Sequence, residues 1–284
     1  MKLVTYNIQY GTGRDGKFDL ARIAKEIEAA DIIALQEVCR NFPRNDGVDM
    51  IEGLAALLPD YFYTFAPATD LDTGGTDNQG RPLNKRFQFG NMVLSRFPIV
   101  ASRNLLLPRT MRPIGLNLQR GALEALVVTP SGPLRIYSVH LDHISVTERT
   151  LQIHHLKERV FAYMGEGGAI TGTTRLGFPE LPVPEEFILM GDFNMVKNSP
   201  EYVLMIGEPD SAGPRPVHHP VDVSSLGDGL PENSVSWVDD ARPQDNKLLD
   251  FAFVQPSLAS RVGKVWIDSE AKGSDHLPIW FELA

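Results

Sequence analysis

The chain has 284 residues, of which 43% are hydrophobic and 22% are charged. This composition is typical of a protein that buries a large core, and it excludes a disordered or collagen-like chain. The 27 Lys and Arg residues against 36 Asp and Glu residues give a net charge of −9, so bulk charge cannot attract the protein to nucleic acid or to an anionic membrane.

Length and even composition predict a single domain over residues 1–284. Cys39 is the single cysteine and cannot form an internal disulfide, and the first residues contain no apolar run of the kind found in signal peptides. No apolar stretch reaches the roughly 18 residues of a transmembrane helix. We therefore expect a cytoplasmic protein that has no membrane anchor and is a monomer.

Short β-branched or apolar runs recur along the chain between polar loops, which predicts strands. The predicted strands cover residues 2–8, 31–38, 91–97, 122–128, 134–141, 186–193, 248–254, 263–267 and 278–284. Amphipathic helices are predicted around Phe18, Ile23 and Ile27 and over 145–164. Some predicted strands alternate apolar and polar residues and others are apolar nearly throughout, so each sheet should have one face in a central core and the other under helices. The pattern predicts a two-sheet sandwich covered by helices.

Three long segments rich in Gly, Pro and polar residues interrupt this pattern. They span 66–90, 165–185 and 207–233, and the last of them holds His218 and His219. Irregular loops of this length in a compact protein are usually functional or mobile. We take 165–185 as a candidate cover over a ligand pocket, which it would restrict to small substrates.

Segment 66–90 also carries a small cluster of cations, Arg81, Lys85 and Arg86. Two interpretations are equally open. The cluster either binds a second phosphate or a polynucleotide backbone, or consists of solvated loop charges. No basic stripe interleaved with aromatic residues, as expected of a nucleic-acid groove, is present elsewhere in the sequence.

Acidic, amide and histidine side chains recur where the predicted strands end or begin. They are Asn7, Glu37, His140, Asp142, Asp192 and Asn194 near strand ends, Asp250 within its strand, and Asp275 and His276 just before the last strand. In layered α/β proteins such side chains converge on one rim, where ligands usually bind. Each residue alone has a simpler explanation as a turn former or helix cap. The set, and not any single member, predicts a functional site.

The donor atoms of this set suit a hard divalent cation. They are the carboxylates of Glu37, Asp192, Asp250 and Asp275 and the amide oxygens of Asn7 and Asn194. Oxygen ligands of this kind favour Mg²⁺, Mn²⁺ or Ca²⁺ over a structural zinc site. Magnesium usually takes only one or two protein carboxylates, so other acids remain free. His276 and Asp250 can then form a dyad in which the carboxylate fixes the imidazole tautomer and the imidazole activates water.

The order and spacing of these motifs resemble the endonuclease/exonuclease/phosphatase superfamily of metal-dependent phosphoesterases. The matching boxes are TYNI (5–8), LQEV (35–38), GNMVLSRFPI (90–99), RGALEA (120–125), YSVHLDH (137–143), ERTLQ (148–152), GDFN (191–194), SW (236–237), LLDFAFV (248–254) and SDHLPI (274–279). One such box would be a weak signal, whereas a series in the same order is specific. The resemblance implies an α/β fold, a four-layered sandwich of two mostly antiparallel β-sheets flanked by helices.

The resemblance also implies roles for the metal and phosphate ligands. Glu37 would bind the catalytic Mg²⁺, for which Mn²⁺ is the expected substitute, and Asn7 would help to hold metal or phosphate. Asp192 and Asn194 would contact the attacking water and the scissile phosphate, with Asp192 also among the metal residues. Asp275 would bind the metal directly or would interact with the residues that bind it.

For the catalytic histidines, the resemblance implies that His276 acts with Asp250 as its orienting partner. His140 would donate a hydrogen bond to the phosphate or to the leaving oxygen, and as an imidazolium it would add positive charge. Whether His276 or Asp192 removes the proton from water is open at this point. Arg120, Arg149 and Gln152 are expected to brace the loop around His140 rather than to touch substrate.

The expected activity is Mg²⁺-dependent hydrolysis of a phosphodiester bond by water attack at phosphorus, as in nuclease-like phosphodiesterases. The alternative is a phosphatase or a phospholipase C or sphingomyelinase-like enzyme that acts on a small or lipid phosphoester. A non-catalytic phosphate-binding protein is the least favoured reading, because no catalytic position has been lost. The partner is thus a phosphoester substrate, with nucleic acid among the candidates.

Overall fold

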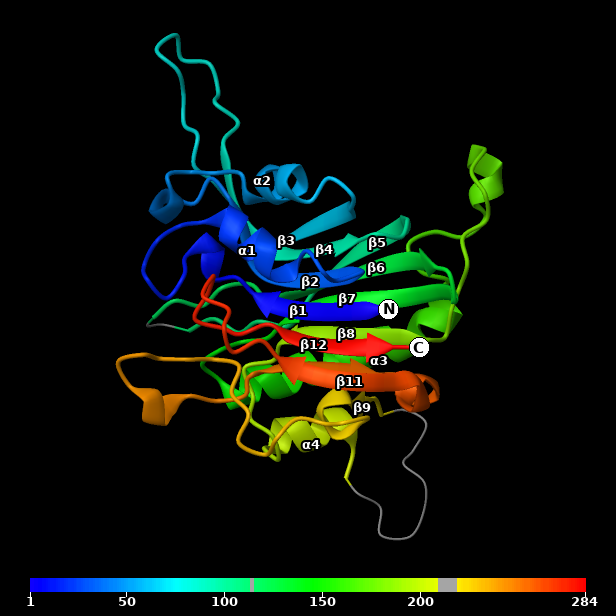
Figure 1. The fold of residues 1–284 in the computed structure, drawn as a ribbon. Helices are drawn as coiled ribbons and strands as arrows, with labels where there is room; N and C mark the ends of the chain where they lie inside the picture. The colour runs from blue at the N-terminus through cyan, green and yellow to red at the C-terminus, as the bar shows by residue number, and fades with distance from the viewer. Residues whose placement is uncertain (113–114, 209–218) are drawn as a thin grey trace.

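The computed structural model describes residues 1–112, 115–208 and 219–284. Its strands form two sheets that lie face to face (Figure 1). The first sheet contains, in spatial order, β11 (Val262–Ile267), β12 (Ile279–Leu283), β1 (Lys2–Asn7), β2 (Ile32–Arg40), β4 (Arg86–Ser95) and β3 (Phe62–Asp72). The second contains β5 (Ile99–Leu106), β6 (Gly121–Thr129), β7 (Gly132–His140), β8 (Phe187–Asp192), β10 (Asp250–Val254) and β9 (Val221–Asp222).

Each sheet has one parallel pair of strands at its centre. β1 is parallel to β2 and β7 is parallel to β8, whereas the other described neighbours are antiparallel. The mostly antiparallel two-sheet architecture predicted above is therefore confirmed. Parallel neighbours need a crossover connection. The chain supplies one with α1 (Leu20–Ile27) between β1 and β2, and another with α3 (Val146–Glu166) between β7 and β8.

The α-helices cover the outer faces of the sheets and begin at capping residues that the sequence supplies locally. α1 and α2 (Met50–Leu57) pack on the first sheet, and α3 and α4 (Pro200–Ile206) pack on the second. The side chains of Asp19, Asp49, Ser145 and Ser199 accept hydrogen bonds from backbone N–H groups of the first turns. A cap of this kind contributes about 1 kcal/mol to helix stability. Short 3₁₀ helices lie at Gln9–Gly11, Pro43–Asn45, Thr173–Leu176, Val223–Ser225, Pro243–Asp245 and Pro256–Arg261.

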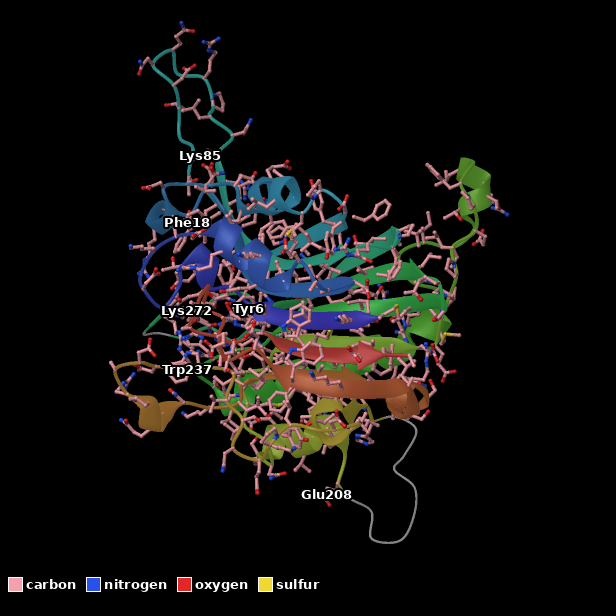
Figure 2. The ribbon with its side chains drawn as sticks, in the orientation of Figure 1. Tyr6, Phe18, Lys85, Glu208, Trp237 and Lys272 are labelled. Atoms are coloured by element: carbon pink, nitrogen blue, oxygen red, sulfur yellow. The ribbon has the colours of Figure 1, made fainter. Side chains whose placement is uncertain are left out.

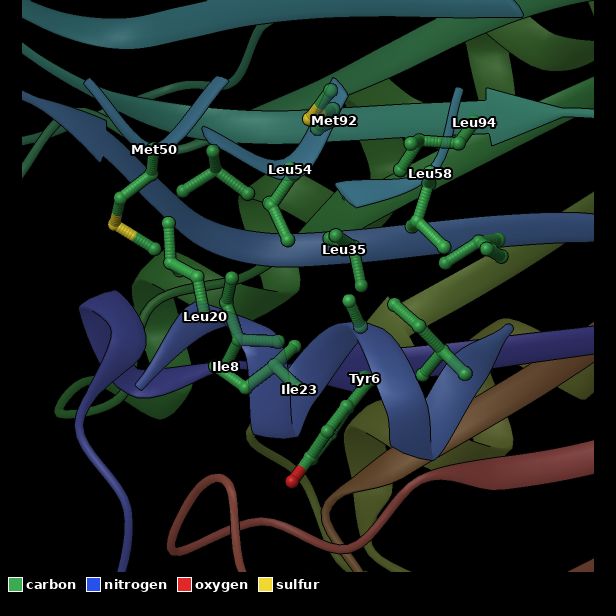
Figure 3. Packing of buried hydrophobic residues seen from close by; sticks show 14 of the residues in the cluster. Tyr6, Ile8, Leu20, Ile23, Leu35, Met50, Leu54, Leu58, Met92 and Leu94 are labelled. Carbon is green, nitrogen blue, oxygen red and sulfur yellow. The ribbon is translucent and has the colours of Figure 1, made fainter. Parts of the chain in front are cut away.

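Successive side chains of a strand point to opposite faces of its sheet. The buried residues therefore form one hydrophobic cluster between the sheets and two clusters beneath the helices. Leu3 and Ile32 belong to the cluster between the sheets, whereas the adjacent Val4 and Ile33 belong to the cluster beneath α1 and α2. Figure 3 shows this outer cluster, with Ile23 of α1 packing over the first sheet. Burying such a side chain stabilises the fold by roughly 1.5–3 kcal/mol. Both faces of each sheet are thus covered, which produces the expected four layers.

Three strands and two helices of the structure are missing from the sequence-based prediction: β3, β5, β9, α2 and α4. The prediction of an irregular segment over 66–90 is wrong, because β3 runs to Asp72 and β4 begins at Arg86, so the two form a long hairpin. This hairpin projects from the body at the upper left of Figure 1. β4 was recognised only from residue 91, and β3 was not recognised because its outer end, up to Asp72, is exposed and polar, which removes the apolar alternation that marks a half-buried strand.

The other two long segments, 165–185 and 207–233, differ in how much regular structure they contain. Segment 165–185 is irregular apart from the 3₁₀ turn Thr173–Leu176, as expected. In segment 207–233, β9 adds a short strand beside β10, while His218 lies outside the described residues. Among the helices of the described chain, none combines the length and the apolar character that a membrane span requires.

Candidate active site

The predicted convergence of polar side chains occurs at the ends of the two parallel strand pairs. Asn7 ends β1, and His140 and Asp192 end β7 and β8 as direct neighbours across the strands. Antiparallel β10 begins with Asp250 opposite Asp192, so His140, Asp192 and Asp250 form a row across three strands. The segment before β12 adds His276. A cavity of about 960 Å³ opens at this end of the sheets, on the side where Figure 2 shows Trp237, one of its lining residues.

His276 and Asp250 form a buried dyad. The Nδ1 of His276 lies 2.7 Å from Oδ2 of Asp250, and the hydroxyl of Ser236 donates to the same carboxylate oxygen at 2.7 Å. Burial by itself lowers the pKa of His276, but the charges of Asp250 and Asp192 outweigh it and raise this pKa to about 10. In the metal-free protein, His276 is thus an imidazolium at neutral pH, fixed with its Nε2 toward Asp192 at 3.8 Å.

Asp192 lies at the centre of the site and contacts residues from both sheets. Its Oδ2 accepts a hydrogen bond from the Nδ2 of Asn7 at 3.0 Å and lies 3.4 Å from the Nε2 of His140. Its Oδ1 accepts from the backbone N–H of Asn194 at 2.9 Å. Burial raises the pKa of Asp192 to about 6, although His276 opposes this shift. The carboxylate therefore titrates close to neutral pH, in the range that suits a proton acceptor.

Glu37 enters the site through a β-bulge. The register between β2 and β4 shifts between Leu35 and Val38, and Glu37 has a left-handed backbone with φ of 61°. A bulge redirects a side chain that regular alternation would place elsewhere. Burial raises the pKa of Glu37 to about 7 against the opposing charge of Arg120. Its carboxylate accepts no hydrogen bond from the described residues and lies 4.0 Å from the Nε2 of His140.

Backbone strain is concentrated around these side chains. Gln9 and Tyr10 (φ of 41° and 44°), Glu37 and Asn194 (φ of 49°) all occupy the left-handed region, which costs roughly 1–3 kcal/mol for a residue other than Gly. At Gly191, by contrast, a Cβ would lie 1.9 Å from the carbonyl oxygen of Val139. Only Gly fits beside β7 there, which explains the Gly of the GDFN box.

The charge at His140 differs from the sequence-based expectation. The Nη1 of the buried Arg120 lies 2.8 Å from Nε2 and 3.0 Å from Nδ1 of His140, and its Nη2 lies 3.0 Å from Nδ1 of His143. Burial and the adjacent guanidinium hold the pKa of His140 well below its usual range. His140 is therefore neutral, and Arg120 rather than an imidazolium at His140 supplies the positive charge on this side of the cavity.

Of the other predicted site residues, Asn7, Asn194 and Asp275 line the cavity, whereas Asp142 and Asp250 do not. Asp275 lines it and accepts from the Nε1 of Trp237 at 3.2 Å. Both amide atoms of Asn7 are engaged, since Oδ1 accepts from the N–H of Gln9 at 3.1 Å and Nδ2 donates to Asp192. This favours Asn7 as a residue that positions Asp192. Asp142 does not line the cavity and instead pairs with Arg112 at 2.6 Å.

Sequence reasoning missed the polar contacts that join the sheets beneath the site. The Nε2 of Gln36 donates to Oγ of Ser138 at 2.9 Å, and Ser138 donates to the carbonyl of Leu35 at 2.8 Å. Asn91 donates to the carbonyls of Ser138 and Gly121 at 2.9 and 2.8 Å. Isolated polar residues in apolar runs were the available signal, because a buried polar group needs a partner.

Bracing residues on α3 support the loop that follows His140. Oε1 of Gln152 accepts from the N–H of Asp142 at 2.8 Å, and Nη1 of Arg149 donates to the carbonyl of Asp142 at 3.1 Å. Arg149 also contacts Glu201 on α4 at 2.8 Å. These contacts correspond to the bracing role expected from the sequence.

The expectation that segment 165–185 covers the pocket is wrong. None of its described residues lines the cavity, and in Figure 1 its 3₁₀ turn lies at the right, away from the arrowhead of β1. The segment precedes β8, so it lies near the start of that strand, whereas the site lies at its end. The cavity wall comes instead from the base of the β3–β4 hairpin, through Leu71 and Phe87.

The donor set fits a divalent cation. Single oxygen or nitrogen atoms of Asp192, Asp250 and His276 all lie within 4.8 Å of one another, but Asp250 and His276 are already hydrogen-bonded to each other. The raised pKa values of Glu37 and Asp192 indicate carboxylates that lack sufficient positive charge around them. The carboxylates of Glu37, Asp192 and Asp275 line the same cavity and offer further oxygen ligands for a divalent cation.

Comparisons with known proteins agree with this fold. Residues 4–276 match the model of the endonuclease/exonuclease/phosphatase family, so the chain belongs to that family, whose members hydrolyse phosphoesters. No curated protein sequence matches the chain.

Solved structures share the fold at low sequence identity. A mannosyl-6-phosphatase from Bacteroides thetaiotaomicron is 19% identical with a TM-score of 0.67, covering 100% of this chain and 99% of that one. An endonuclease/exonuclease/phosphatase from Bacteroides vulgatus is 19% identical with a TM-score of 0.65, covering 100% and 98%. The human nocturnin catalytic domain is 18% identical with a TM-score of 0.60, covering 100% and 94%.

Proposed function

We propose that the chain is a Mg²⁺-dependent phosphodiesterase, with Mn²⁺ as a substitute metal, that hydrolyses its substrate by water attack at phosphorus. The observation that carries this proposal is the position of Asp192, whose Oδ2 lies 3.4 Å from the Nε2 of His140 and 3.8 Å from the Nε2 of His276, while a carboxylate oxygen of Glu37 lies 4.0 Å from the same His140 nitrogen. A phosphate ester resists attack because it is anionic, so catalysis needs positive charge at its oxygens and an aligned water.

A divalent cation held by Glu37 with Asp192 or Asp275 would supply charge at the phosphate oxygens. Asp192 is the proposed acceptor of the water proton, because its pKa lies near 6. His276 is protonated in the metal-free site and fixed by Asp250, so it donates to the phosphate or the leaving oxygen. Arg120 adds the second fixed positive charge.

The charges of the cavity suit an anionic phosphoester. Its lining carries the carboxylates of Glu37, Asp192, Glu201 and Asp275 and the cations of Arg44, Arg120, Arg149 and Lys247, and the protonated His276 adds a further positive charge. Arg149 is already paired with Glu201. A phosphomonoester carries about −1.5 to −2 charges at pH 7 and a diester carries one, so the two substrate classes are distinguished by the hydrolysis test and not by this charge.

The test is hydrolysis of bis-p-nitrophenyl phosphate, p-nitrophenyl phosphate and plasmid DNA in parallel, with Mg²⁺, Mn²⁺ or EDTA. We expect metal-dependent cleavage of the diester that EDTA abolishes. Faster cleavage of the monoester would favour the second candidate, a phosphatase, which the structural similarity to a mannosyl-6-phosphatase supports. Full activity in excess EDTA would refute the metal-dependent reaction. The monomeric state and the cytoplasmic location stay predictions.

A further inference from the structure

Three neighbouring aromatic side chains, those of Tyr10, Phe42 and Phe87, line one side of the cavity. The ring centroids of Tyr10 and Phe42 are 5.1 Å apart at an interplanar angle of 65°, and those of Phe42 and Phe87 are 5.3 Å apart at 33°. These three rings, which we call the aromatic wall, line the cavity and are only partly buried against the core beneath α1 and α2. Part of each ring surface therefore remains available to a ligand.

Hydrogen bonds and a ring contact link the aromatic wall to the proposed catalytic residues. Asn7, which donates to Asp192, also accepts the N–H of Gln9, and this contact holds the strained turn that presents Tyr10. On β4, Phe89 follows two positions after Phe87 and lies 6.3 Å, centroid to centroid, from the ring of His140. The positive φ values of Gln9 and Tyr10 thus place the Tyr10 ring on the wall of the same cavity that holds Asp192.

The cations near the cavity do not form a track for a polynucleotide. Arg120 and Arg149 are engaged with His140 and Glu201, and the guanidinium of Arg44 lies 6.0 Å from the centroid of the Phe42 ring. Among the described lining residues this leaves Lys247 as the other lysine or arginine. On the adjacent hairpin, Arg81 pairs with Asp77 at 3.0 Å and Arg86 pairs with Asp70 at 2.5 Å. Nucleic-acid affinity depends on neutralising many phosphates. Of the two interpretations of the hairpin cations, solvated and locally paired charges are therefore favoured.

We propose that the aromatic wall of Tyr10, Phe42 and Phe87 binds a flat, uncharged ring on the substrate, so that the preferred substrate is a small phosphodiester with an aromatic or heteroaromatic substituent. This inference rests on the proposed phosphodiesterase function. Aromatic side chains bind flat rings by stacking and edge contacts regardless of the detailed identity of the ring. The catalytic residues fix the phosphate, and the wall selects the group attached to it.

The test is competitive inhibition of bis-p-nitrophenyl phosphate hydrolysis by three monoanions: methyl phenylphosphonate, methyl cyclohexylphosphonate and dimethyl phosphate. We expect the phenyl compound to bind about tenfold more tightly than dimethyl phosphate, within the range that one stacked ring contributes. It should also bind more tightly than the cyclohexyl compound. In Phe42→Leu and Phe87→Leu, which keep an apolar side chain, the preference for phenyl over cyclohexyl should disappear.

Phe178→Ala is the matched control, because Phe178 is an exposed phenylalanine that does not line the cavity, and this variant should keep the preference. Equal or tighter binding of the cyclohexyl compound to the unmodified protein would overturn the flat-ring inference and favour an alkyl or lipid group. Tighter inhibition by a single-stranded DNA oligonucleotide, unchanged in the wall variants, would overturn it in favour of a polynucleotide. If the diester is not hydrolysed, the proposed function fails, and calorimetric binding of the three monoanions with Mg²⁺ still tests the wall.

Discussion

Replacing Asp250 by Asn removes the charge that fixes His276 while keeping the side chain nearly isosteric. Asp250 is 1% exposed and lies 2.7 Å from Nδ1 of His276. Asp250 and Asp192 together raise the pKa of His276 to about 10, compared with an ordinary value of 6.5. Each unit corresponds to about 1.4 kcal/mol. The protonated dyad in the metal-free protein therefore stabilises the fold by an amount on the order of 5 kcal/mol near pH 6, of which Asp250 contributes the larger share.

The pH dependence of this stabilisation has a definite sign. Because the folded protein holds the proton more tightly than the unfolded chain, the stabilisation is fully present below pH 6.5 and is lost as the pH rises through about 10. We expect Asp250→Asn to lower the free energy of unfolding by several kcal/mol at pH 6, and the difference from the unmodified protein should shrink steadily toward pH 10.

The assay is urea unfolding in EDTA at pH 6, 8 and 10, followed by far-UV circular dichroism. Asp239→Asn is the control, because Asp239 lies outside the cavity lining and pairs with Arg242 at the surface, and it should change stability by the same small amount at each pH. A loss in Asp250→Asn that is constant from pH 6 to pH 10 would refute the assignment of His276 as an imidazolium held by Asp250.

Three further predictions concern individual residues of the site. His276→Ala should lower kcat at least ~10²-fold with an unchanged circular dichroism spectrum, as for a positioned acid–base group; an unchanged rate would contradict its role. Glu37→Gln should raise the Mg²⁺ concentration for half-maximal activity at least ~10-fold, because an ionised oxygen ligand is lost, and an unchanged metal titration would show that Glu37 is not a ligand. Arg120→Met should raise the pKa of His140, which burial and Arg120 now lower; an unshifted histidine resonance in an NMR titration of the metal-free variant would exclude this coupling.

Strand periodicity and local caps made much of the fold predictable. The predicted strands correspond to β1, β2, β4, β6, β7, β8, β10, β11 and β12. They alternate or are apolar throughout because the sheets bury both of their faces. β3 was missed because Pro67 and the polar residues at its outer end interrupt the apolar alternation, so its pairing with β4 rests there on backbone hydrogen bonds that leave little trace in side-chain character.

The sequence by itself was sufficient to group most of the residues that line the candidate site. Asn7, Glu37, Asp192 and His276 follow or precede buried strands, and the ends of strands in a layered sheet meet at one rim, so local pattern was sufficient to group them. The spacing of the motif boxes added the family, because a series of boxes in fixed order is a property of the chain alone.

Only the tertiary structure decided the charge of the site and the shape of its walls. His140 is neutral because Arg120, from the start of the neighbouring strand, lies against its ring. Tyr10, Phe42 and Phe87 form one wall although they come from three separate segments, and segment 165–185 lies away from the cavity. Such properties depend on distances across the folded chain, since electrostatic interactions and ring contacts act through space. No local stretch of sequence encodes those distances.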